Sequence, residues 1–308
     1  MCIVSFNACS SDNGKIASGP EKKISWYTND YKSAITVTYM SPQSGWRIFV
    51  GPFVLLILIY LVWFIRYPTW RWFESVEQLF LMLISSYLAV LLLSMVFLKK
   101  EARKSLSQVF KIHGYSTVIL GTVLAFLFQA IWLLISWGIA GEFEFISFPS
   151  LKGYESYTVQ SMFFGSILYL AFAVFGAFAE EITFRGYIQS RIASRYGCAV
   201  GIFTASLFFS LEHIHIFEIS WVERFFQTQF VYVFCFGIFV GYLFFKSRED
   251  IWGVFAFHAF ANVFNVLLPI RVTFVVPLGN QFVTIMSFTL MILLLRSWFS
   301  RGVQTRGT

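Results

Sequence analysis

The sequence has little charge for its length. Of its 308 residues, 13% are charged, whereas 57% are hydrophobic and 20% are aromatic. Soluble globular domains carry charge on about a quarter of their residues. An ordinary soluble fold is therefore excluded, and most of the chain must face lipid or pack inside a helix bundle.

Aspartate and cysteine are also scarce. The scarcity of aspartate excludes a buried aspartyl pair, since the only aspartates are Asp12, Asp30 and Asp250. The cysteines are Cys2, Cys9, Cys198 and Cys235. They have neither the spacing of metal ligands nor the paired pattern of disulfide-bonded secreted proteins. We therefore expect them to be free thiols. The His-Glu-x-x-His motif of zinc proteases and the Gly-x-Ser-x-Gly elbow of serine hydrolases are absent too.

Long apolar runs are abundant. A helix needs about 20 mostly apolar residues to cross a bilayer core, and several segments approach or reach this length. They are Ile48 to Ile65, Leu79 to Leu98, Tyr115 to Ile139, Ser161 to Ala179, Cys198 to Phe217, Phe226 to Phe245, Ile251 to Pro269 and Leu278 to Leu295. We predict an all-α fold, a polytopic transmembrane bundle of about eight helices.

The positive charge of the chain follows the loops between these spans. The net charge of +7 could indicate nucleic acid, but Lys and Arg lie beside alternate span ends, which is typical of membrane proteins. This alternation predicts both termini in the cytoplasm, with the lipid bilayer and not nucleic acid as partner. We expect a polar cytoplasmic segment at 1–47, a transmembrane domain at 48–298 and a cytoplasmic tail at 299–308, in a bacterial inner membrane.

The first three spans contain no ionisable residue except tyrosine at their centres. The other ionisable residues within the spans lie after Ser161. The fourth span ends in Glu180, Glu181 and Arg185. Glu181 and Arg185 are four residues apart on one helix face and can form an ion pair. Glu180, rotated by about 100°, would stay available as a general base. Taken alone, these residues could also be charges that reach to the membrane surface.

Histidines and an asparagine lie in two later spans. His213 could assist a base or bind water, whereas we expect Glu212 and His215 to be structural. His258 and Asn262 lie one helical turn apart, so their side chains could converge on a developing oxyanion. Taken alone, this pair could equally form hydrogen bonds between helices.

The combined pattern resembles the three-motif signature of the CAAX protease and bacteriocin-processing family, over about residues 161–269. That family includes the Ras-converting CAAX endopeptidase and many bacterial Abi-type membrane proteins. The resemblance implies that Glu180 activates water with help from His213. It also implies that His258 and Asn262 form an oxyanion hole, while Glu181 and Arg185 brace the site.

The function expected from this resemblance is an intramembrane endopeptidase that cleaves a peptide or protein substrate without metal or cofactor. A zinc version with Glu and two His ligands stays open, as does a non-catalytic membrane partner in bacteriocin immunity or regulation. A transporter is disfavoured by the absence of repeats.

The depth of the site poses a difficulty for this reading. Helical rise leaves Glu180 at the cytoplasmic edge but His213 about 22 Å into its span. We therefore expect the fourth helix to continue past Arg185 and the fifth to begin later than Cys198, together with some opening to water.

Overall fold

The computed structural model describes residues 46–69, 76–102, 109–110, 114–145, 159–214, 219–267, 270–274 and 278–304. Apart from Trp46 and Arg47, the segment predicted at 1–47 lies outside the described residues, as does His215. Cys198 and Cys235 are free thiols, as expected, whereas Cys2 and Cys9 are not described.

The described chain is built from helices, and each predicted span overlaps one of them. Apolar sequences in lipid satisfy their backbone polar groups within the helix, which is why these runs are helical. The helices are α1 (Arg47–Thr69), α2 (Val76–Phe97), α4 (Tyr115–Ile139), α5 (Val159–Glu181), α7 (Cys198–Glu212), α9 (Phe230–Lys246), α10 (Ile251–Leu267) and α11 (Gly279–Gln304). The predicted all-α helix bundle is confirmed.

The number of spans is not confirmed as eight. Among the described residues, four helices are long and apolar enough to cross a membrane, namely α1, α2, α4 and α11. A fifth is possible if α8 (Ile219–Thr228) and α9, which meet at a bend of 60°, form one span. The predicted sixth span began at Phe226, but α9 begins only after this bend, where the polar run Gln227-Thr228-Gln229 interrupts the apolar sequence.

The fourth predicted helix does continue past Arg185, as expected. The π-helical segment η3 (Ile182–Gln189) and then α6 (Ser190–Tyr196) follow α5 without a break. Gly197, with a positive φ of 85°, ends this run and permits the sharp reversal into α7. The later start predicted for the fifth helix is wrong, because α7 begins at Cys198.

This helical hairpin explains how the two halves of the predicted site meet. Glu180 and His213 are almost equally far from Gly197 along the chain, so antiparallel arms bring them to one level. His213 is the residue that ends α7, rather than a group inside a longer span. The predicted end of this span at Phe217 is therefore wrong. Because His213 lies at the end of α7, it is at the level of Glu180 and not about 22 Å away from it along the helix axis.

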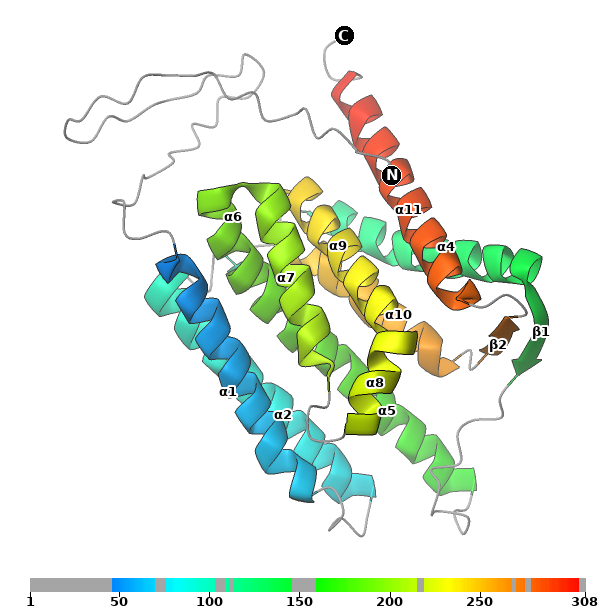
Figure 1. Ribbon diagram of the computed structural model, residues 1–308, viewed down its shortest axis with the longest axis horizontal. Coiled ribbons are helices and arrows are strands. Elements are labelled where there is room, and N and C mark those ends of the chain that lie inside the picture. The colour runs from blue at the N-terminus through cyan, green and yellow to red at the C-terminus, as the bar shows by residue number, and fades with distance from the viewer. Residues whose placement is uncertain are drawn as a thin grey trace. The chain divides into compact units, whose positions relative to one another are not determined.

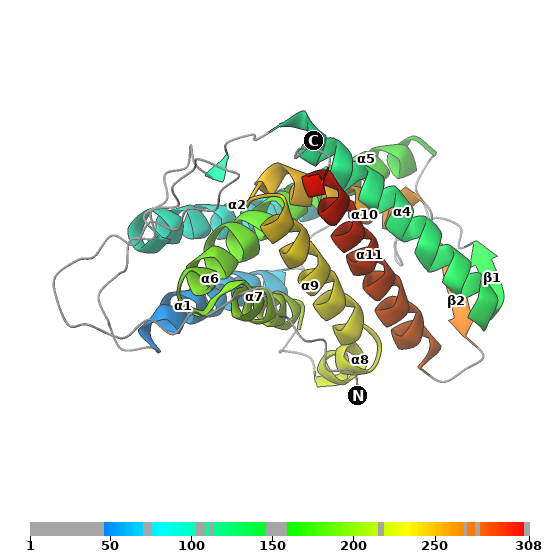
Figure 2. The same ribbon diagram turned by 90° about the horizontal axis from the view of Figure 1, so that it is seen from above.

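Helix packing surrounds the hairpin. Figures 1 and 2 show α11 beside α9 and α4, while α5 packs against α2 and α10, and α7 against α9. Small residues allow these close approaches: a Cβ atom at Gly237 of α9 would lie 2.9 Å from the Cβ of Ser206 in α7. The core between the helices is rich in phenylalanine.

A short antiparallel sheet was not predicted. Strand β1 (Ala140–Phe145) follows α4 and pairs with β2 (Ile270–Phe274), which follows α10. Glu144 stands opposite Arg271 in the register. The sheet joins the ends of two helices that already pack against each other (Figure 1).

Candidate active site

Glu181 is the centre of a buried ionic network. Its Oε1 atom accepts hydrogen bonds from Arg185 Nη1 at 3.1 Å and from His258 Nδ1 at 2.6 Å. The side chains of Glu181 and Arg185 are 0% and 1% exposed. Buried charges are energetically costly unless they are paired. The predicted ion pair between Glu181 and Arg185 is confirmed.

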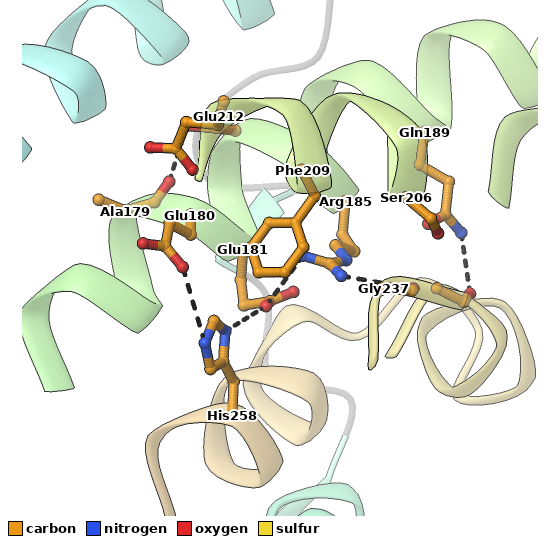
Figure 3. Close-up of polar contacts among 12 residues, drawn as sticks. Ala179, Glu180, Glu181, Arg185, Gln189, Ser206, Phe209, Glu212, Gly237 and His258 are labelled. Carbon is orange, nitrogen blue, oxygen red and sulfur yellow. Dashed lines mark hydrogen bonds and ion pairs between the residues drawn. The ribbon is translucent and has the colours of Figure 1, made fainter. Parts of the chain in front are cut away.

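Arg185 also links the hairpin to its neighbours. Its Nη2 atom donates to the carbonyl of Gly237 in α9 at 3.4 Å, and its guanidinium lies 4.7 Å from the ring centroid of Phe209 in α7. A cation over an aromatic face is attracted to it. Arg185 therefore connects η3, α7 and α9 around the carboxylates, as Figure 3 shows.

Glu180 points away from this arginine, as expected, but it is not without contacts. Its Oε1 atom accepts a hydrogen bond of 2.8 Å from the hydroxyl of Tyr87 in α2. Its Oε2 atom lies 3.6 Å from Nε2 of His258. The imidazole of His258 thus stands between the two glutamates, with one ring nitrogen toward each (Figure 3).

The end of α7 adds two further groups. Glu180, Glu212 and His213 each offer a ligand atom, and these atoms lie within 4.8 Å of one another. The side chain of His213 is 35% exposed, and its Nδ1 lies 2.8 Å from the carbonyl oxygen of Phe209. This set could hold a metal ion, since carboxylate and imidazole are both zinc ligands.

Glu212, which the sequence predicts to be structural, lies next to the predicted site residues Glu180 and His213. It is 8% exposed, and its Oε2 atom has no hydrogen-bond partner among the described residues. A charged residue inside an apolar helix, adjacent to His213, is a signal of function in membrane proteins. That signal could have found Glu212.

Asn262 forms a hydrogen bond with the backbone of α5. Its Nδ2 atom donates to the carbonyl of Ala173 in α5 at 3.3 Å. Both ring nitrogens of His258 face glutamates. The two predicted oxyanion donors therefore do not point at a common position here, and this role stays a prediction.

Comparison with known families bears on the hairpin and the helices that follow it. Residues 161–264 match the family model described as type II CAAX prenyl endopeptidase Rce1-like. No curated protein matches the chain. The matched segment contains all six residues predicted for the site, whereas Tyr87 lies outside it. The match and the span-capable helices indicate an integral membrane protein of the CAAX protease class. Residues 161–264 of this chain are therefore similar to the Rce1-like type II CAAX prenyl endopeptidases.

Proposed function

We propose that the protein is an intramembrane endopeptidase of the glutamate type, which hydrolyses a peptide bond in a membrane-associated substrate such as a prenylated or leader peptide. One observation carries this proposal, namely the position of Glu180. It is buried and held through Oε1 by Tyr87, and its other oxygen lies 3.6 Å from Nε2 of His258, which is beyond hydrogen-bond distance. A carboxylate placed in this way suits general-base catalysis.

The proposed reaction begins at Glu180, which takes a proton from a water molecule with the assistance of His213. The water oxygen attacks the scissile carbonyl carbon and forms a tetrahedral anion, which needs hydrogen-bond donors. We assign these donors to His258 and Asn262. The bond between carbon and nitrogen then breaks, and Glu180 returns the proton to the leaving amine.

Glu181 has an orienting role in this proposal. By accepting the Nδ1 proton of His258 at 2.6 Å, it directs Nε2 toward the reacting groups, as the carboxylate of a catalytic triad does. Nε2 lies 3.6 Å from Glu180, which is longer than a hydrogen bond. With Nδ1–H held by Glu181, Nε2 carries a proton when His258 is the imidazolium cation, and in that form it can donate to a substrate oxygen. Asn262 would have to leave Ala173 to join it.

The setting of the reaction is part of the proposal. The protein would act in a bacterial inner membrane, with both termini in the cytoplasm and the bilayer around the apolar helices. Its partner would be the peptide or protein substrate, and the reaction itself would need no metal or cofactor.

The test is cleavage of a panel of membrane-tethered and prenylated peptides by the purified protein in detergent. Glu180→Gln keeps the shape of the side chain but removes the base, so we expect activity to fall by at least about 100-fold. Glu223→Gln, which removes an exposed carboxylate from α8, is the matched control and should cleave like the wild type. If Glu180→Gln also cleaves like the wild type, the proposal is wrong, and a non-catalytic role in immunity or regulation takes its place.

A second candidate, zinc-dependent hydrolysis at the same position, is favoured by the cluster of Glu180, Glu212 and His213. Three protein ligands with a fourth position for water are typical of catalytic zinc sites. The measurement is the zinc content of the purified protein and of Glu212→Gln. One zinc per chain that this substitution removes, together with loss of cleavage on chelation, would replace the metal-free mechanism.

A further inference from the structure

Tyr87 connects the first half of the chain to the candidate site. It belongs to α2, outside the segment that matches the protease family, in the half where the sequence predicts no chemistry. Its hydroxyl donates to Glu180 Oε1 at 2.8 Å in a buried position. A hydrogen bond to a charged group is worth more than one between neutral groups, so this contact bears directly on the proposed base.

The tyrosine ring is held in place from two sides. It meets the ring of Trp63 in α1 edge-on, with centroids 5.5 Å apart, and the ring of Phe172 in α5 at 5.2 Å. Aromatic pairs in these ranges prefer such tilted and edge-to-face geometries. Three helices therefore determine where the hydroxyl of Tyr87 points.

Gly176 completes this arrangement from α5, one helical turn before Glu180. A Cβ atom at Gly176 would lie 3.0 Å from the Cζ of Tyr87 and 3.2 Å from its hydroxyl oxygen. These distances are shorter than ordinary van der Waals contact. A methyl group at Gly176 would therefore press on the tyrosine ring, which lies close to α5 with glycine at this position.

From these contacts we infer that Tyr87 is a positioning residue for the reaction, which holds Glu180 through Oε1 and leaves Oε2 for the attacking water. The inference rests on the proposed function, because it assigns Glu180 as the base. It makes α2 a part of the active site, although α2 lies outside the protease-like segment.

The hydrogen bond fixes the direction in which the carboxylate of Glu180 points. Other groups also lie near Glu180, so the effect of Tyr87 must be measured with these groups unchanged. These groups are His258 from α10, Glu212 and His213 from the end of α7, and Glu181 and Arg185 from its own helical run.

The experiment compares Tyr87→Phe with the wild type in the peptide-cleavage assay. We expect kcat to fall about 10-fold or more with KM little changed, because the Glu180 carboxylate is no longer held in the direction of the attacking water. A side chain that only stabilised the fold would lower the unfolding temperature without this split between kcat and KM.

The matched control is Ser94→Ala. Ser94 also lies in α2 and makes a buried hydrogen bond of 2.6 Å to Thr183 in η3, so it links the same helical layers without touching Glu180. It should keep the kcat of the wild type. If Tyr87→Phe lowers kcat no more than Ser94→Ala does, the inference is overturned while the proposed function stands. Activity retained in Glu180→Gln would instead remove the proposed function.

A second variant covers the case in which Tyr87→Phe does not fold. Gly176→Ala leaves both functional side chains intact but pushes the tyrosine ring away from α5. It should lower kcat with KM little changed. A wild-type kcat for Gly176→Ala, in protein that elutes as the wild type does, would contradict the inference.

Discussion

At the scale of single residues, two adjacent glutamates have different surroundings. Glu181 pairs with Arg185 and His258, whereas Glu180 is held by Tyr87 and lies near His258. Neighbouring residues on a helix point about 100° apart, so one carboxylate is neutralised while the other faces α2 and the end of α7. These different surroundings support the proposal that Glu181 orients His258 and that Glu180 transfers the proton.

The role of Asn262 can be tested at this scale. If its amide joins His258 in stabilising the anion, Asn262→Ala should lower kcat by about 100-fold or more with little effect on KM. The measurement is the steady-state cleavage of the best peptide of the panel. If the amide only links α10 to Ala173 of α5, the loss should appear in thermal stability instead.

Asn280→Ala is the control for Asn262→Ala. Asn280 in α11 also donates from Nδ2 to a backbone carbonyl of another helix, that of Thr228, at the same distance of 3.3 Å, but it is exposed. Both substitutions remove one such hydrogen bond. Equal kcat values for the two variants would rule out an oxyanion role for Asn262.

At the scale of elements, the crossing of α4 and α10 sets the position of His258 and Asn262. A Cβ atom at Gly121 of α4 would overlap the carbonyl oxygen of Gly253 in α10 and lie 3.1 Å from the backbone nitrogen of Phe257. The obstacle is backbone, which cannot rotate away as a side chain can. The two helices therefore approach each other closely only because both positions are glycine.

Gly121→Ala should force these helices apart. We expect a loss of about 1–3 kcal/mol from overpacking, measured as a lower unfolding temperature in detergent, together with reduced cleavage because α10 carries two site residues. Gly138→Ala in the same helix is the control, since a Cβ atom there meets nothing within 4 Å. It should be neutral or stabilising by up to about 1 kcal/mol. Equal behaviour of the two variants would contradict the tight crossing.

At the scale of the whole molecule, we predict the orientation in the membrane from the distribution of charge. Arg296, Arg301 and Arg306 accompany the end of α11, whereas Arg271 in β2 precedes it. Residues Gly279–Phe299 of α11 are long and apolar enough to separate these two regions across a bilayer. Because the side richer in Lys and Arg stays in the cytoplasm, the chain should end there.

Reporter fusions in a bacterial host test this orientation. Green fluorescent protein, which folds in the cytoplasm, should be fluorescent when fused to Thr308. Alkaline phosphatase, which is active only outside the cytoplasm, should be active when fused after Phe274 and inactive when fused to Thr308. The opposite pattern would show that the C-terminus lies on the other side.

The sequence by itself determined where the helices lie and which residues could do chemistry. The helix predicted from Tyr115 to Ile139 has these same bounds in the structure, and the ion pair of Glu181 with Arg185 is where helical spacing puts it. Hydrophobic length and spacing along one helix are local properties, so they can be read without knowledge of neighbouring helices.

Only the tertiary structure decided which of these residues meet. It brought Tyr87 from α2 and Glu212 from α7 to Glu180, and it turned Asn262 toward Ala173. These contacts depend on how closely helices distant in sequence can approach, which is determined at a few positions by the absence of a side chain. No period or motif within one helix carries that information, because it belongs to the packing of pairs of helices.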